Sequence, residues 1–224
     1  MKKVLFIGFE DCVYSQNAFN FTKRSGFDVT CFWASRERKT KIPQSILEWS
    51  GDYIFHLKSY CILPKRVLES VNNFAINFHP SPPQYPGSGG LNRGLYNRDN
   101  YTGVTVHLMN EKIDNGQIID FYKVPIFEND SIKTIVPRVH AKQLEAYCDI
   151  VDKISRNDVS FLTPTTDYRW GHHVGRIRDI DKLQKISAEI SKEELERIIR
   201  ATSIGRFRPV VNLHGYNFYL KEEE

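Results

Sequence analysis

Three polar side chains near the middle of the chain could act together on one carbonyl carbon. Asn77 and His79 are two residues apart at the end of a strand-like run, so their side chains point to the same side. Asp114 lies in a tight turn that ends at Gly116. An amide or imidazole N–H can stabilise an oxyanion, a histidine can move a proton near neutral pH, and a carboxylate can orient that histidine and raise its pKa. These residues therefore indicate acyl transfer to an amine.

The elements that must position these residues begin with alternating strands and helices. Short apolar runs predict strands at residues 3–9, 27–34, 53–57 and 74–78. Helical patterns lie between them at residues 13–25, 43–49 and 64–71, with a charged loop at 35–41. This alternation predicts an α/β fold with a mostly parallel, Rossmann-like sheet and right-handed crossovers. Ligands bind such sheets at the carboxyl ends of the strands, where we expect Asn77 and His79 to lie.

The pattern changes after the fourth predicted strand. A loop rich in proline and glycine leads to a short helix at 91–97 and to two more strands, at 103–109 and 118–125. A long helix is expected at 131–154, with Ser131 as its N-cap and Pro137 near its start. After a polar, basic stretch at 163–181, a helix is expected at 191–202 and a hairpin at 208–220, turning at His214 and Gly215. We therefore expect a domain at 1–160 and a small C-terminal helix and β-hairpin extension at 161–224.

The composition excludes several kinds of partner. The formal net charge of +4 is small, so it fits an anionic small molecule better than a nucleic acid. No apolar run approaches the roughly 20 residues that span a bilayer, so we expect no membrane partner. The four cysteines form no paired or zinc-binding pattern, and His172 and His173 have no suitable carboxylate nearby, so no metal is expected. With a strand pattern starting at once, we expect no leader and a reducing, cytoplasmic location.

The segment around the three polar residues resembles the formyltransferase family that uses 10-formyltetrahydrofolate. Three blocks occur in the family's order, reading NFHPS from Asn77, TGVT from Thr102 and DNG from Asp114. The resemblance covers about residues 2–154 and implies an N-formyltransferase with 10-formyltetrahydrofolate as co-substrate. It also implies that Asn77, His79 and Asp114 are the catalytic residues.

The resemblance implies a folate site as well. Residues 59–68 are similar to the family segment that holds the pterin, and the loop at 110–114 would close the other side of the ring. The folate-binding residues implied in this way are Cys61, Ile62, Leu63, Leu68, Asn110 and Ile113. The family usually carries Leu-Leu-Pro and Arg-Gly after the Pro-Ser, whereas this chain reads PPQYPG at 82–87, so the contacts made through this loop stay open.

The tail at residues 190–220 resembles that of the short nucleotide-sugar N-formyltransferases. These enzymes formylate a 3- or 4-amino group of a dideoxy sugar on a nucleoside diphosphate, such as dTDP-4-amino-4,6-dideoxyglucose, for O-antigen biosynthesis. The resemblance would place Arg176 near the diphosphate and Tyr219 near the base. The substrate-binding residues expected here are Ser81, Tyr85, Gly87, Arg176 and Tyr219.

Other functions remain open at this point. A glycinamide ribonucleotide formyltransferase would fit the length but would not need the extension. A methionyl-tRNA formyltransferase normally carries a complete C-terminal β-barrel domain. A folate-binding module without turnover would not need all three polar residues. For the favoured function we expect a reduced folate and a nucleotide sugar as partners, and a homodimer formed through the C-terminal part.

Overall fold

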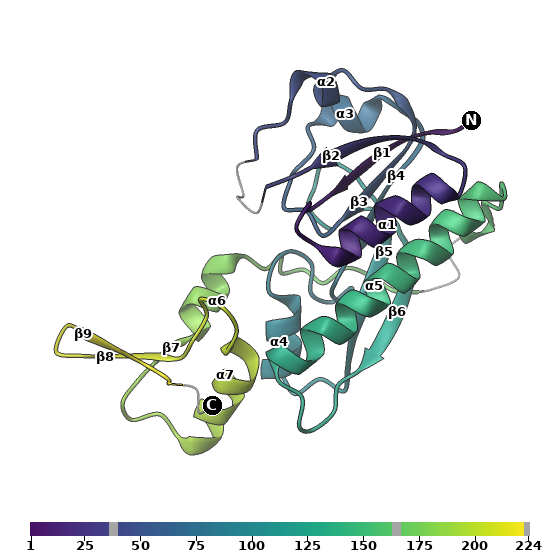
Figure 1. Ribbon diagram of the computed structural model, residues 1–224. Helices are drawn as coiled ribbons and strands as arrows, with labels where there is room; N and C mark the ends of the chain where they lie inside the picture. The colour runs from purple at the N-terminus through teal and green to yellow at the C-terminus, as the bar shows by residue number, and fades with distance from the viewer. Residues whose placement is uncertain (36–39, 163–166, 222–224) are drawn as a thin grey trace.

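The larger sheet has six strands in the order β2-β1-β3-β4-β5-β6 (Figure 1). This computed structural model describes residues 1–35, 40–162 and 167–221. The four parallel strands are β1 (Lys3–Gly8), β2 (Asp28–Trp33), β3 (Gly51–Leu57) and β4 (Val71–His79). Two antiparallel strands extend the sheet, β5 (Tyr101–Leu108) and β6 (Ile118–Pro125). The mostly parallel, Rossmann-like sheet that the sequence predicts is therefore confirmed.

Helices cover both faces of this sheet. On one face, α1 (Val13–Arg24) and α5 (Ile132–Ser155) pack against strand residues such as Phe6 and Phe55. On the other face lie α2 (Gln44–Leu47) and α3 (Lys65–Glu69), which cover the alternate strand residues Leu5, Ile7 and Ile54. Successive side chains of a strand point to opposite faces, so the continuous apolar runs of β1 and β3 follow from burial on both sides.

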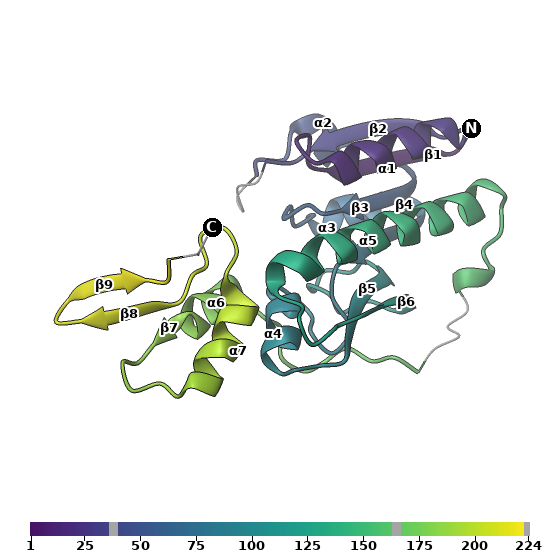
Figure 2. The same ribbon diagram turned by 60° about the horizontal axis from the view of Figure 1, so that its bottom comes forward.

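The C-terminal extension carries a second, three-stranded sheet in the order β7-β8-β9. After the short 3-10 helix η1 (Ser160–Leu162), its elements are α6 (Ile177–Leu183), β7 (Lys185–Ile186), α7 (Lys192–Thr202), β8 (Val210–Leu213) and β9 (Tyr216–Tyr219). Figure 2 shows the β8–β9 hairpin projecting away from the larger sheet. The hairpin turns at His214 and Gly215, which both have positive φ, as the sequence predicts.

Polar contacts fix α7 against α4 (Gly90–Tyr96) and against the loop before α5. Asn92 Nδ2 donates to the carbonyl of Ala201 at 2.6 Å, and the Arg197 guanidinium lies over the Tyr96 ring. Arg200 donates to the carbonyls of Asp130 and Phe127. The extension is thus held to the larger sheet through α4, the helix that follows the proline-rich loop.

The main departure from the sequence expectations is α6. The stretch at 163–181 was described as polar and basic, with no helix expected in it, but a helix begins at Ile177, where Asp179 accepts the backbone N–H of Arg176. Pro137 lies inside α5 without moving its start beyond Ile132. Residues 36–39 of the expected charged loop and 163–166 of the polar stretch lie outside the described residues. The division at residue 160 stays a prediction.

Among the residues that the structure describes, Tyr147 is the largest fully buried side chain, and it connects the core on the α1–α5 face. Its ring packs against Phe78, Phe55 and Phe6 with centroid separations of 4.9, 5.9 and 6.0 Å. Thr22 donates its hydroxyl to the carbonyl of Ala18, so the Tyr147 hydroxyl must donate to Thr22 Oγ1, 2.5 Å away. Tyr147 therefore contributes both packing and one buried hydrogen bond.

Replacing Tyr147 should separate these two contributions. We expect Tyr147→Phe to lower the free energy of unfolding by about 1 kcal/mol, because it removes only the hydrogen bond. Tyr147→Ala should cost about 3–5 kcal/mol, because it also leaves a cavity. Urea denaturation followed by circular dichroism measures both values, with the exposed Tyr60→Phe as the control. Equal losses for the two Tyr147 variants would contradict this assignment.

Candidate active site

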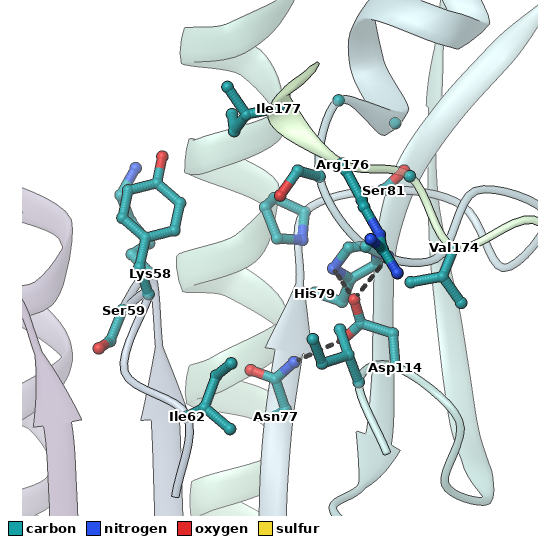
Figure 3. Close-up of a pocket in the computed structure, with 18 of the residues that line it drawn as sticks. Lys58, Ser59, Ile62, Asn77, His79, Ser81, Asp114, Val174, Arg176 and Ile177 are labelled. Carbon is teal, nitrogen blue, oxygen red and sulfur yellow. Dashed lines mark hydrogen bonds and ion pairs between the residues drawn. The ribbon is translucent and has the colours of Figure 1, made fainter. Parts of the chain in front are cut away.

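The three predicted catalytic residues meet at one end of the larger sheet, in a cleft of about 820 Å³ (Figure 3). Asn77 and His79 lie at the carboxyl end of β4, and Asp114 lies in the turn between β5 and β6. The cleft is also lined by the loop after β3, by the proline-rich loop and by residues 174–178 of the extension. This is the edge where parallel α/β sheets bind their ligands.

The carboxylate of Asp114 lies at the centre of the polar network and contacts four of its groups. One carboxylate oxygen lies 3.3 Å from His79 Nδ1 and accepts the backbone N–H of Gly87 at 2.8 Å. The other oxygen accepts Asn77 Nδ2 at 3.3 Å and lies 3.3 Å from His107 Nε2. Burial alone would raise the pKa of Asp114, but the two histidines and the Gly87 amide outweigh it and hold that pKa well below its usual range. Asp114 is therefore ionised at neutral pH.

His79 is buried, and each of its ring nitrogens has a defined neighbour. Nε2 donates to the carbonyl of Tyr85 at 3.1 Å, which leaves Nδ1 beside Asp114. Burial lowers the pKa of His79 below 6.5, and the opposing pull of Asp114 does not cancel this effect. A neutral ring that donates from Nε2 carries its lone pair on Nδ1. His79 can therefore accept a proton at Nδ1 and form an ion pair with Asp114.

Asn77 lies between two histidines that the sequence analysis did not identify as site residues. Its Nδ2 must face Asp114, because the carboxylate can only accept, and the same Nδ2 donates to His107 Nε2 at 3.0 Å. Its Oδ1 faces His56 Nδ1 at 3.0 Å. In the sheet, Asn77 is the direct register partner of His56 on β3 and of His107 on β5. Strand register is the signal that would have found them, and the sequence alone does not give it.

The proline-rich loop beside the trio is held by the start of the extension. Gly171 and Gly175 donate their backbone N–H groups to the carbonyls of Pro83 and Pro86 at 3.0 and 2.8 Å. The Ser88 N–H donates back to Gly175. A Cβ on Gly175 would lie 2.3 Å from the Ser88 carbonyl oxygen, so this close approach requires glycine. The loop therefore has a fixed shape although its sequence departs from the family pattern.

Two further side chains, also missed by the sequence analysis, complete this arrangement. Arg93 donates to the carbonyls of Pro86 and His173 at 2.8 and 3.1 Å and lies over the ring of Tyr85. Trp170 donates its indole N–H to the carbonyl of Gly116 at 2.7 Å. The Trp170 ring contacts the His107 ring with a centroid separation of 4.9 Å and lies 6.0 Å from the His79 ring. The extension thus packs directly on the polar network around Asp114.

All six residues expected around the pterin line the cleft, namely Cys61, Ile62, Leu63, Leu68, Asn110 and Ile113. Ile62 and Ile113 are exposed there, at 66% and 49% of their surface, whereas Cys61 and Leu63 are buried. Burial raises the pKa of the Cys61 thiol to about 11, so the thiol stays protonated at neutral pH. Among the residues that the structure describes, no three metal-binding side chains cluster together.

Of the five residues expected to bind the acceptor, three line the cleft and two do not. Ser81, Gly87 and Arg176 line the cleft, and the Ser81 hydroxyl is buried without a hydrogen-bond partner. Tyr85 instead packs inside the loop and donates its hydroxyl to Asp99 at 2.7 Å. Tyr219 is 61% exposed on the projecting hairpin and does not line the cleft. Contacts of Tyr85 and Tyr219 with an acceptor stay predictions that this arrangement does not support.

Comparisons with known proteins show which family the chain belongs to. A family model described as formyl transferase matches residues 11–151. The chain is 27% identical over 175 residues to a methionyl-tRNA formyltransferase of Buchnera aphidicola subsp. Acyrthosiphon pisum, which covers 77% of this chain and 54% of that protein. The chain thus spans about half the length of this curated relative. No helix in the described ranges is long and apolar enough to cross a bilayer.

Two solved structures are similar over nearly the whole chain. A 4-N formyltransferase from Francisella tularensis superimposes with a TM-score of 0.78 at 21% identity, covering 99% of this chain and 97% of that one. An N-formyltransferase from Helicobacter canadensis, solved with folinic acid and dTDP-3-aminofucose, gives a TM-score of 0.73 at 18% identity and covers 96% and 85%. These likenesses establish a shared fold. Because the family model matches well over half of the residues, this chain belongs to the formyl transferase family.

Proposed function

We propose that this protein transfers a formyl group from 10-formyltetrahydrofolate to the amine of a nucleotide-linked amino-dideoxy sugar. The observation that carries the proposal is the buried, ionised Asp114 beside a neutral His79 and the amide of Asn77, all at the floor of one cleft. This set contains an oxyanion donor, a proton acceptor and a charge to stabilise the protonated acceptor.

The three residues would have different roles in the reaction. The neutral amine attacks the formyl carbon, and the carbonyl oxygen of the formyl group becomes an oxyanion. Asn77 Nδ2 donates to this oxyanion, exchanging one of its present contacts for the new charge. His79 Nδ1 takes the proton of the attacking amine, and Asp114 stabilises the resulting imidazolium. Collapse of the intermediate breaks the bond to the folate nitrogen, and the proton on His79 can be passed to that leaving nitrogen.

The apolar side of the cleft fits the folate. Ile62 and Ile113 expose large apolar side chains inside the cleft, although isoleucine is usually buried. A flat, largely apolar ring placed between them would remove this surface from water. The pterin would then lie beside Asn77, with its carried formyl group facing the catalytic residues.

The basic side of the cleft fits the nucleotide sugar. Arg176 and Arg178 line it from the extension, and an arginine pair can bind a diphosphate through several charge-assisted hydrogen bonds. The Helicobacter canadensis neighbour, of the same fold, was solved with a dTDP-linked amino sugar. The methionyl-tRNA and glycinamide ribonucleotide acceptors are supported by sequence relatives over smaller shares of those proteins. The identity of the sugar, the position of its amine and the cytoplasmic location stay predictions.

A panel of acceptors tests this function directly. We expect formyl transfer from 10-formyltetrahydrofolate to a dTDP-linked 3- or 4-amino-dideoxy sugar, and little transfer to the free amino sugar, glycinamide ribonucleotide or methionyl-tRNA. Mass spectrometry of the formylated product measures each rate. His79→Ala should lower turnover at least about 100-fold because it removes the proton acceptor, while the circular dichroism spectrum stays unchanged. A His79→Ala variant with near-normal turnover would refute the mechanism.

The pH dependence tests the pairing of His79 with Asp114. Neutral His79 is the active form and its pKa lies below 6.5, so the acid limb of the kcat profile should have its midpoint below pH 6.5. Asp114 raises the pKa of His79, so Asp114→Asn should move this limb to still lower pH and also lower kcat. The acceptor amine titrates equally in both enzymes, which makes the difference between the two profiles the readout. An acid limb that moves upward in Asp114→Asn would contradict the assignment.

We also propose that the protein forms a homodimer through the β8–β9 hairpin. Strand β9 is the edge of its sheet, and all of its residues are exposed, including Tyr216, Phe218 and Tyr219. An exposed edge strand can pair with another chain, and exposed apolar side chains that gather on it mark an interaction site. A second copy fits, because two identical edges can pair antiparallel about a two-fold axis and close the assembly.

Sedimentation equilibrium tests this dimer. The wild-type protein should sediment at twice the mass of one chain, and a Tyr216→Ser, Phe218→Ser double variant should shift toward the monomer because the covered apolar surface is lost. Val159→Ser, which changes an exposed apolar residue far from the hairpin in sequence, should leave the mass unchanged. A monomeric wild type at micromolar concentration would overturn the proposed interface.

A further inference from the structure

His56 is a buried titratable residue that the proposed reaction does not use. It is the penultimate residue of β3, only 6% of its surface is exposed, and it lines the cleft. It is also the register partner of Asn77 on the neighbouring strand, so the two side chains leave the sheet on the same face. A polar ring in this position needs a partner for each nitrogen, because an unsatisfied buried donor is costly.

The first partner of His56 is the catalytic amide. His56 Nδ1 lies 3.0 Å from Asn77 Oδ1. The amide orientation is already decided at its other end, where Nδ2 faces the carboxylate of Asp114. The oxygen must therefore face His56, and a hydrogen bond there requires the proton on Nδ1. With both ends of the amide held, rotation of the Asn77 side chain would break contacts to His56 and Asp114 together.

The second partner of His56 belongs to the expected folate segment. His56 Nε2 lies 3.0 Å from the carbonyl oxygen of Cys61, and the Cys61 side chain is itself buried. The Cys61 backbone N–H donates to Ser59 Oγ, which keeps this turn closed. One ring therefore contacts both the oxyanion donor and the backbone that is expected to hold the pterin.

The pKa of the His56 ring is set by several neighbouring groups. Burial lowers the pKa of His56, while the Asn77 and Cys61 oxygens and the nearby Asp114 oppose this and His107 adds to it. A neutral ring has one N–H for two acceptors, so a change at the Cys61 carbonyl alters how firmly Nδ1–H holds Asn77.

We propose that His56 is a positioning residue, which fixes the amide of Asn77 for the oxyanion and couples it to the folate segment through the Cys61 carbonyl. This inference rests on the proposed formyl transfer. His56 does not touch the reacting atoms, so its removal should act on the chemical step through Asn77 and should change the binding of the acceptor little.

Steady-state kinetics of matched variants tests the proposal. His56→Leu should lower kcat about tenfold or more, with the KM of the acceptor within about threefold of the wild type. His56→Asn places an amide N–H near the position of Nδ1 and should restore kcat to within about threefold. Phe55 lies on the same strand, but its side chain is buried in the core on the α1–α5 face of the sheet. Phe55→Leu should therefore lower thermal stability without lowering kcat. If His56→Leu does not fold, His56→Phe replaces it, because its ring fills the site without an N–H.

A double-variant cycle then shows whether His56 acts through Asn77. In an Asn77→Ala background, His56→Leu should lower the single-turnover rate by less than about twofold. If the two effects simply multiply, His56 acts independently of the amide and the proposal is overturned.

A measurement without turnover separates this inference from the proposed function. The side-chain NH₂ resonances of Asn77, identified by their loss in Asn77→Ala, should be protected from hydrogen exchange in the wild type. They should exchange at least about tenfold faster in His56→Leu but not in Phe55→Leu. Protection that is unchanged in His56→Leu would overturn the positioning role, even if the wild type transfers formyl groups. An inactive wild type with the expected exchange pattern would refute the function alone.

Discussion

A buried carboxylate stays ionised only when hydrogen-bond donors and titratable bases surround it, and the site depends on this condition at Asp114. Asp114 accepts hydrogen bonds from Asn77 on β4 and from the Gly87 amide in the proline-rich loop, and the rings of His79 on β4 and His107 on β5 lie 3.3 Å from its oxygens. The same charge fixes the amide of Asn77 and stabilises a proton on His79. If the carboxylate were neutral, it could accept fewer of these bonds, and the loop would lose its attachment to the turn. The ionisation of one group therefore sets both the geometry and the chemistry of the cleft.

The register of the sheet is the second constraint. Asn77 lies between His56 and His107 because β3 and β5 pair with β4 at these residues. A shift of one residue in either pairing would turn the neighbouring histidine to the opposite face of the sheet. The apolar residues of the same strands resist such a shift, since Phe55 and Phe78 are buried against Tyr147 on the far side. Core packing on one face of the sheet thus specifies the polar network on the other.

These constraints explain which parts of the protein the sequence could predict. The strands, the long helix and the hairpin turn follow from apolar periodicity and from residues such as Gly215, and the trio followed from its motif. His56, His107 and Trp170 could not be predicted in the same way, because their roles depend on register and on long-range packing. Helix α6 was missed because its short, charged sequence carries little apolar periodicity and its start depends on the local cap at Asp179. Tyr219 was expected at the acceptor from the resemblance of the tail, but it is exposed on the projecting hairpin and does not line the cleft.

Under the proposed function, the start of the extension would connect acceptor recognition to Asn77, His79 and Asp114. The family match ends at residue 151, yet Trp170 contacts His107 and Gly175 pairs with the proline-rich loop. The next residue, Arg176, enters the cleft. An acceptor anion bound by Arg176 would therefore lie next to the backbone that holds the proline-rich loop. The Gly87 amide of that loop donates to Asp114. Because this backbone is fixed by hydrogen bonds at Pro83 and Pro86, the acceptor would meet a site that is formed before it binds, and less of its binding energy would be needed to order the loop. Under the proposed function, variation in the extension would in this way change which amine is accepted, while Asn77 and His79 on β4 keep their geometry.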